Sequence, residues 1–231
     1  MTLCVYAVVS SSWPVQRLTG VGGERLRAIP FDGVIAVAGG IRRRPAASTR
    51  NLRQYAAVVE SIAARVPAIL PARFGTTFDD VAELTLVLRS RGASMRQRLR
   101  AVRRRTQMTI RILGSDPVNG PLSRGQTPVT SRTGVRPRNR ATQGTQYLRQ
   151  RLAVLRTARE VPELAAIRPA IRRFVKDERV ERRGGIATVH HLIPRATAER
   201  YRAAVEHAAA KSGIRLIVSG PFAPYAFADN W

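Results

Sequence analysis

The first hundred residues alternate between strand-like and helix-like spacing of apolar positions. A β-branched and aromatic run covers Cys4–Ser10, and further candidate strands cover Arg25–Phe31 and Gly33–Ile41. Asp32 and Gly33 lie where the last two runs meet. Both residues tolerate the positive φ that a type I′ hairpin turn requires. We therefore predict that the chain opens with a strand followed by a hairpin.

From Asn51 the apolar spacing becomes that of a helix, which Pro67 ends. Its apolar residues recur at intervals of three and four: Leu52, Tyr55, Val59, Ile62 and Val66. A short strand at Ala68–Leu70 then precedes a second helix. Thr76 or Thr77 is the expected cap of that helix, with Asp79 and Asp80 in its first turn, where the positive end of the helix dipole favours acids.

Residues 114–145 differ from both neighbouring parts of the chain. They are rich in Gly, Pro, Ser, Thr and Arg and contain almost no large apolar side chains. Such a segment cannot bury enough apolar surface to offset its ordering entropy. We predict a flexible basic linker or loop here, which separates a domain at 1–113, ending in a strand at Thr109–Leu113, from a domain at 146–231.

The second part has the pattern of a small α+β unit. Helices are expected around Leu148–Leu155 and Leu164–Phe174, and a strand at Ile186–Ile193. A further helix, capped by Thr197 and ended by Gly213, leads to a strand at Ile214–Ser219. A strand–helix–strand unit of this length predicts a right-handed parallel crossover. The fold class is therefore α+β or mixed α/β, with two small domains joined by a Gly/Pro/Arg-rich linker.

The composition adds a strong positive charge to this picture. The chain has 231 residues and is 44% hydrophobic, which is enough for a globular core, and 40 basic against 15 acidic residues give it a net charge of +25. Such a charge attracts polyanions, acidic proteins and anionic surfaces. Only two of the basic residues are lysines, Lys176 and Lys211, and this arginine bias also fits a GC-rich coding sequence.

The distribution of arginine keeps nucleic-acid binding open as an alternative function. Nine arginines and no acid lie between Arg89 and Arg111, and the linker adds Arg124, Arg132, Arg136, Arg138 and Arg140. These side chains would release counterions from a phosphate backbone. No aromatic residue is interleaved with them to stack on bases, and no recognition motif is present. The alternative function is therefore nonspecific nucleic-acid binding through an arginine-rich surface.

Residues suited to catalysis or to binding a metal are sparse. A single cysteine, Cys4, excludes an intramolecular disulfide and a cysteine-based metal site, and its apolar neighbours indicate a buried thiol. His190 and His191 are adjacent on a predicted strand, so they point to opposite faces and cannot share a metal. We expect no enzyme activity, no cofactor and no metal. Because no apolar run is long enough to cross a bilayer, we also expect a cytoplasmic protein without membrane contact.

Two local segments are more distinctive than the composition. Leu70–Phe78 places a proline, an arginine and a glycine where a strand gives way to a helix. Gly220–Phe227 holds three aromatic residues among prolines, which restrict φ and make the segment semi-rigid. Its rings either dock back to seal the second domain or form a partner-binding surface. We further hypothesise that the Arg73 guanidinium is partly buried and bonds chain-end carbonyls or stacks on Tyr225 or Phe227.

At these segments the chain resembles the gas vesicle GvpL/GvpF family. Leu70–Phe78 matches the family's Leu-Pro-x-Arg-Phe-Gly-Thr-x-Phe segment, and Gly220–Phe227 matches its terminal Gly-Pro-Trp-Pro-Pro-Tyr-x-Phe segment with Phe222 for Trp and Ala223 for Pro. A weaker match, Gly-x-x-Tyr-Leu, lies at Gly144–Leu148. The candidate partner-binding residues are those of the matched motifs: Pro71, Arg73, Phe74, Gly75, Phe78, Tyr147, Gly220, Pro221, Phe222, Pro224, Tyr225 and Phe227.

The resemblance implies a minor structural protein or assembly factor of the gas vesicle, a gas-filled protein shell in the cytoplasm. It implies binding to the small hydrophobic shell protein and to other gas vesicle accessory proteins, and it implies that the second domain is ferredoxin-like. Typical members are acidic or near neutral, whereas this chain carries +25. That departure implies either an acidic partner or the coding bias noted above.

Overall fold

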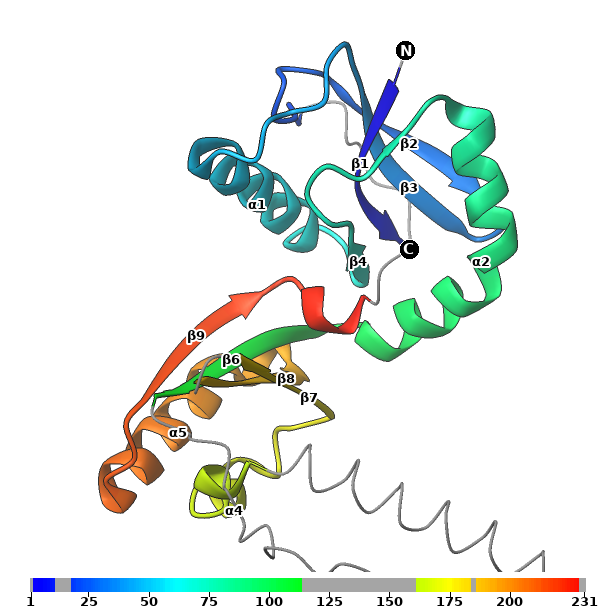
Figure 1. The fold of residues 1–231 in the computed structure, drawn as a ribbon. Helices are drawn as coiled ribbons and strands as arrows, with labels where there is room; N and C mark the ends of the chain where they lie inside the picture. Colours follow the sequence, from blue (N-terminus) through cyan, green and yellow to red (C-terminus); the bar gives the residue numbers. More distant parts are fainter. Residues whose placement is uncertain (1, 11–17, 114–160, 184–185, 229–231) are drawn as a thin grey trace, which may run out of the picture.

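The described residues form two antiparallel sheets with helices packed on them, in an α+β arrangement of two domains (Figure 1). The computed structural model describes residues 2–10, 18–113, 161–183 and 186–228. The predicted linker at 114–145, the helix expected from Leu148 and the candidate residue Tyr147 lie outside the described residues.

The first sheet is built around β1 (Thr2–Val9). Its strand order is β2 (Leu26–Phe31), β3 (Val34–Ile41), β1 and β4 (Ile69–Pro71), and β5 (Thr77–Phe78) also pairs with β1. The hairpin predicted between β2 and β3 is confirmed, because Asp32 and Gly33 have φ of 39° and 76°.

Helices α1 (Thr49–Ala63) and α2 (Val81–Val102) cover opposite faces of this sheet. Tyr6 and Ala7 of β1 pack in the cluster beneath α1, whereas Val5 and Val8 pack in the cluster beneath α2. The register of β1 against β3 shifts between Val5 and Ala7, so that two consecutive residues face the same helix. Because both faces are covered, β1 is an unbroken apolar run instead of an alternating one.

The start of α2 differs from the prediction. Thr77 belongs to β5, where Phe78 pairs with Leu3, and Asp80 is the N-cap, with a side-chain oxygen that accepts from the Glu83 backbone N–H at 2.8 Å. Pairing with β1 keeps the threonine backbone extended, so the cap falls three residues after Thr77, at Asp80. The helix then runs without interruption through Gly92.

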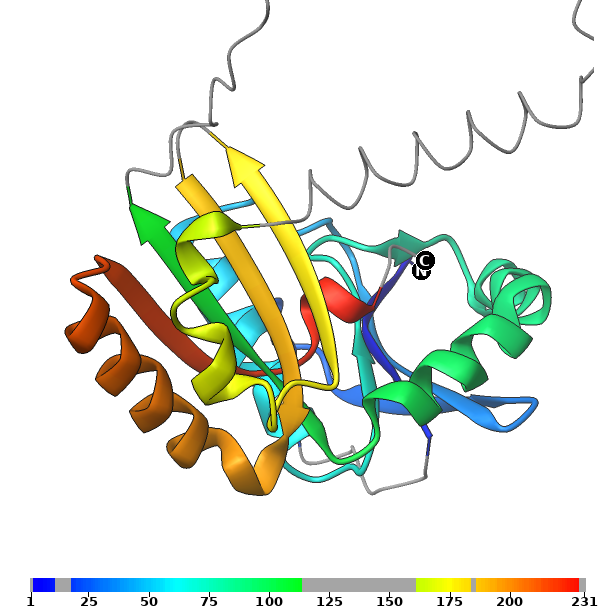
Figure 2. The same cartoon turned by 90° about the horizontal axis from the view of Figure 1, so that it is seen from below.

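The second sheet has the order β7 (Asp177–Arg183), β8 (Ile186–Pro194), β6 (Arg105–Leu113) and β9 (Leu216–Phe222). Both β8 and β9 are antiparallel to β6, so they run parallel to each other, as the predicted crossover through α5 (Ala198–Ser212) requires. With α4 (Arg168–Ile171) between β6 and β7, the element order is ferredoxin-like. Helices α4 and α5 lie on the same face of the sheet (Figures 1 and 2).

The change from one sheet to the other does not fall at residue 114. Strand β6, which we grouped with residues 1–113, begins at Arg105 and pairs along its length with β8 in the second sheet. Alternate residues of β6, namely Met108, Ile110 and Ile112, are buried against α4 and α5, so this strand belongs to the core of the second domain. The first sheet with its helices therefore ends with α2 at Val102.

Two elements of the second domain were predicted poorly. Instead of one helix over Leu164–Phe174, a 3-10 turn η2 (Pro162–Leu164) is followed by the single helical turn α4. Pro169 lacks the N–H that would join the two into one helix. Strand β7, which is almost entirely polar, was not predicted at all.

Candidate functional site

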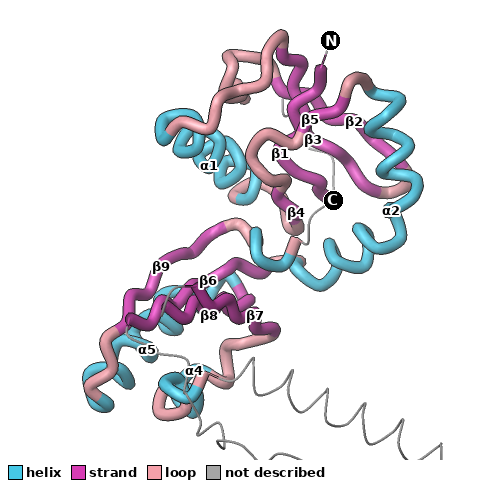
Figure 3. The backbone as a smooth tube through the Cα atoms, viewed as in Figure 1, coloured by secondary structure: helices cyan, strands magenta, loops and turns pink. Residues whose placement is uncertain are grey.

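The Gly220–Phe227 segment leaves the second sheet and docks against the first domain. Its 3-10 turn η4 (Tyr225–Phe227) lies between the two sheets (Figures 1, 2 and 3). Ala223 packs in the cluster beneath α1, whereas Phe227 packs in the cluster beneath α2. The segment therefore contacts the cores on both faces of the first sheet. It does not seal the second domain, as one of our two interpretations supposed, but connects the two domains.

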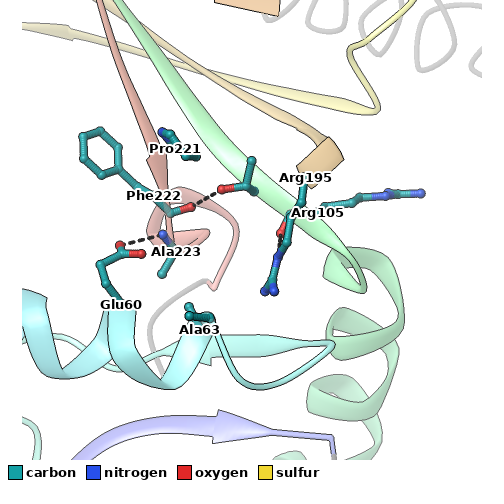
Figure 4. Close-up of a pocket in the computed structure, with 9 residues that line it drawn as sticks. Glu60, Ala63, Arg105, Arg195, Pro221, Phe222 and Ala223 are labelled. Atoms are coloured by element: carbon teal, nitrogen blue, oxygen red, sulfur yellow. Dashed lines mark hydrogen bonds between the residues drawn. The ribbon is translucent and has the colours of Figure 1, made fainter. Parts of the chain in front are cut away.

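Hydrogen bonds to side chains of both domains hold the first half of this segment (Figure 4). From the first domain, Glu60 Oε1 accepts from the Ala223 backbone N–H at 2.8 Å. From the second domain, the Thr106 hydroxyl donates to the Phe222 carbonyl at 2.8 Å. Consecutive residues are thus tied to different domains.

The second half of the segment is held in the same way. Gln107 Oε1 accepts from the Ala226 backbone N–H at 2.8 Å, and an Arg98 guanidinium nitrogen donates to the Ala228 carbonyl at 3.1 Å. The Arg179 guanidinium lies 5.4 Å from the centre of the Phe227 ring, within the range of a cation–π contact. Side chains of α2, β6 and β7 therefore meet on one short turn.

The segment has an anchoring side and an exposed side. Phe227 is only 4% exposed, and Ala223 and Pro224 are also buried. Phe222 and Tyr225 keep 39% and 37% of their surface exposed. The buried residues fix the backbone from which the two exposed rings project.

A cavity of about 190 Å³ opens beside Phe222 at the junction of the domains. Residues of α1, β6, the start of η3 (Arg195–Thr197) and the C-terminal segment line it: Glu60, Ala63, Ala64, Arg105, Thr106, Arg195, Pro221, Phe222 and Ala223 (Figure 4). Arg195 spans the junction, because it donates to the Val66 carbonyl at 3.2 Å and to the Arg105 carbonyl at 3.3 Å.

Burial perturbs the ionisable groups of this cavity. It raises the pKa of Glu60, against the opposing effects of the Ala223 N–H and of Arg195, and it lowers the pKa of Arg195, against the opposing charge of Glu60. Outside the cavity lining, burial raises the pKa of the Tyr225 hydroxyl, and the negative charge of Glu60 raises it further. The cavity itself can offer the Glu60 carboxylate, the Arg195 guanidinium and the Phe222 ring to a partner.

The Leu70–Phe78 segment is built around a buried turn at Gly75. Our hypothesis that the Arg73 guanidinium is partly buried is wrong. Arg73 is exposed. The arginine that bonds this turn is Arg44, whose Nε and a terminal nitrogen donate to the Gly75 carbonyl at 3.1 and 2.5 Å. Gly75 is buried with φ of 78°, a conformation that favours glycine. Pro71 is buried in β4, where it pairs with Ala7.

Tyr55 of α1 is a second residue that sequence reasoning missed. Its hydroxyl donates to the Ala72 carbonyl at 3.0 Å, its ring stacks on Tyr6 at 4.9 Å, and Phe74 packs edge-on against it at 5.4 Å. The position of Tyr55 on an apolar helical face predicted its burial, but not its hydrogen bond. The remaining motif residue of this segment, Phe78, is half-buried in β5.

The two motif segments do meet, although not through Arg73. Strand β4 lies beside η4, and Leu70 and Ala72 share one buried cluster with Phe227. The contact is therefore apolar. It unites the two segments that carry the family resemblance into one structural unit at the domain junction.

The described residues offer little for other chemistry. They contain no group of three or more His, Cys, Asp or Glu side chains arranged to hold a metal ion. Cys4 is buried as predicted, and burial raises the pKa of its thiol to about 11. Among the described helices, none has the length and apolar character needed to span a membrane.

Comparison with known proteins identifies the family. The family described as Gas vesicle synthesis protein GvpL/GvpF matches residues 2–229. The chain belongs to this family. The match covers nearly the whole chain and confirms the resemblance found at the two motif segments.

Solved structures agree with this membership at the level of the fold. The crystal structure of gas vesicle protein GvpF from Microcystis aeruginosa is similar, with a TM-score of 0.72, 15% identity and 99% of each chain covered. That of the gas vesicle protein GvpF from Anabaena sp. PCC7120 has a TM-score of 0.69 and 16% identity, over 100% of this chain and 99% of that chain. None of the curated proteins compared with the chain matches it.

Proposed function

We propose that this GvpL/GvpF member supports the assembly or structure of gas vesicles through protein–protein contacts, without catalysis. Its partners would be the small hydrophobic shell protein and other gas vesicle accessory proteins, at the gas vesicle in the cytoplasm. Family membership supports the general role. The exposed aromatic residues at the domain junction support the choice of contact surface.

The observation that carries the proposal is the exposed pair of rings on an anchored backbone. Phe222 and Tyr225 remain more than a third exposed, although their neighbours Ala223 and Phe227 are buried. Rigid aromatic residues lose little conformational entropy on binding and are frequent interface anchors. The two rings therefore form a surface suited to an apolar partner.

Co-purification with the shell protein tests this proposal. A Phe222→Ser/Tyr225→Ser variant is compared with Leu86→Ser, which removes a more exposed apolar side chain, 62% exposed, from α2. We expect the double variant to fold and to lose most of the bound shell protein, whereas the Leu86→Ser control retains it. Because the contact is apolar, binding of the wild-type chain should change little with moderate salt.

Two outcomes would count against the proposal. If both variants retain the shell protein equally, Phe222 and Tyr225 do not belong to the contact. Binding that disappears at moderate salt would indicate a charged contact instead, as expected for a nucleic acid held by the arginines.

A further inference from the structure

The C-terminal half of α2 presents a strongly one-sided charge to solvent. From Arg89 onward the helix contains no acidic residue, and Arg89, Arg91, Arg100 and Arg103 are all exposed. The acids of the helix and its N-cap, Glu83 and Asp80, lie at its opposite end, and Asp32 of the β2–β3 turn pairs with Arg96. A ligand that recognises charge would therefore bind along the second half of α2.

A groove accompanies these arginines. A cavity of about 410 Å³ lies beside the last turns of α2, against the turn of the β2–β3 hairpin and the segment after α1. Three of its lining residues are arginines, and the others are small or apolar: Ser10, Gly33, Pro67, Arg96, Leu99, Arg100 and Arg103. The concave shape distinguishes this place from an ordinary solvated helix face.

One arginine of the groove already binds a carboxylate of the chain itself. An Arg96 guanidinium nitrogen donates to the Asp32 carboxylate at 2.5 Å and to the Asp32 carbonyl at 2.8 Å. The Asp32 side chain is 67% exposed, so this pair lies at the rim. Arg100, which also lines the groove, donates from Nε to the Arg96 carbonyl at 3.4 Å, one turn earlier in α2. Arg100 and Arg103 thus extend a row whose first member already binds a carboxylate.

We propose that this groove binds an acidic segment of a partner protein, with aspartate or glutamate carboxylates paired to Arg100 and Arg103. The planar guanidinium binds a carboxylate through two parallel hydrogen bonds, which favours this pairing. A second copy of the chain does not fit, because two chains of +25 repel each other. A single-stranded nucleic acid fits less well, because α2 contains no aromatic side chain to stack on a base, and a duplex, which needs only phosphate contacts, is distinguished by experiment.

This site is separate from the aromatic surface at the domain junction, and the proposal holds whether or not that surface binds the shell protein. It also gives the unusual charge a specific use. A chain with one apolar and one basic contact surface can hold two chemically different proteins at the same time.

Peptide binding measured by fluorescence anisotropy tests the proposal. The probe is a short helical peptide with glutamates and leucines along one face, titrated with the full chain. We expect Arg100→Glu/Arg103→Glu to weaken binding about tenfold or more, because each reversal places like charges together. The control Arg42→Glu/Arg43→Glu makes the same charge change at exposed positions after β3 and should bind nearly as the wild type does.

Three results would overturn the proposal: no peptide binding by the wild-type chain at low salt, an equal loss in the control variant, and tighter binding of a short DNA duplex than of the peptide, lost in Arg100→Glu/Arg103→Glu. Absence of peptide binding would exclude an acidic protein segment as the ligand. An equal loss in the control variant would show that only the overall charge matters, and tighter DNA binding would identify the groove as a nucleic-acid site.

Discussion

Glu60 on α1 accepts a hydrogen bond at 2.8 Å from the backbone N–H of Ala223, a residue 163 positions later in the chain. The bond joins the first domain to the segment that leaves the last strand of the second. It lies beside Phe222 and Tyr225, the two aromatic residues of the Gly220–Phe227 segment whose side chains are exposed. The orientation of the candidate contact surface therefore depends on this pairing.

Removing the Glu60 carboxylate should weaken the junction. Glu60→Ala leaves the N–H of the buried Ala223 without its acceptor, and we expect a loss of about 1–3 kcal/mol in the free energy of unfolding. Glu60→Gln keeps an acceptor oxygen and should lose less. Urea denaturation of the three proteins measures this, and equal stability of Glu60→Ala and wild type would show that the bond contributes nothing.

The backbone at Gly220 should not tolerate a side chain. Its φ is 117°, and a Cβ there would lie 2.7 Å from the Gln107 carbonyl oxygen and 2.9 Å from Met108 Sδ. We expect Gly220→Ala to destabilise the protein by about 2–4 kcal/mol.

A matched control for Gly220 is available on α5. Gly213 also has a positive φ, 66°, but a Cβ there meets nothing within 4 Å. Gly213→Ala should therefore cost only about 1 kcal/mol, from the left-handed backbone. Thermal unfolding of both variants gives the comparison, and an equal loss would mean that the close approach to β6 does not matter.

Arg44 and Arg73 should behave oppositely. Arg44→Ala removes two hydrogen bonds to the buried Gly75 turn, and we expect a loss of about 1–2 kcal/mol. Arg73→Ala changes an exposed side chain and should stay within about 0.5 kcal/mol of wild type. Chemical denaturation of both variants measures the difference. A larger loss of stability in Arg73→Ala than in Arg44→Ala would show that Arg73 has a structural role.

Stability should fall in acid because of Glu178 on β7. A hydrogen bond from His191 at 2.7 Å and a two-fold contact with Arg168 lower the pKa of this carboxyl to about 2, from 4.5. Between these values the unfolded chain binds the proton and the folded chain does not. The stabilisation, up to about 3 kcal/mol, is therefore complete above pH 4.5 and disappears as the pH falls towards 2.

A Glu178→Gln variant isolates this effect. Its free energy of unfolding, measured in urea at several pH values, should be lower than that of wild type at neutral pH and should converge with it in acid. A constant difference at every pH would show that the carboxylate charge is not responsible.

Elements with local signals were predictable from the sequence. Strand β1, the Asp32–Gly33 turn and α1 follow from apolar spacing and from turn residues, and the end of α5 follows from Gly213, which has φ of 66°. These signals are contained within a few neighbouring residues. The family was also predictable, because the prolines and aromatics of the two motif segments stand out from the composition.

The remaining features depend on partners far away in the chain. The strand at Arg105–Leu113 has no property that assigns it to one sheet or the other, and only its pairing with β8 does so. Strand β7 lies at the edge of its sheet and is highly charged, which blunts edge pairing but removes the alternating pattern. Arg44 reaches the Gly75 turn across 31 residues, a contact that no local pattern indicates.

Gas vesicle formation in living cells tests the central claim most directly. The gene for this chain is deleted in its host, and pressure-sensitive turbidity is measured after complementation. The wild-type chain should restore the signal, and an equally abundant Phe222→Ser/Tyr225→Ser variant should not. Unchanged vesicles after the deletion, or full restoration by the double variant, would contradict the account.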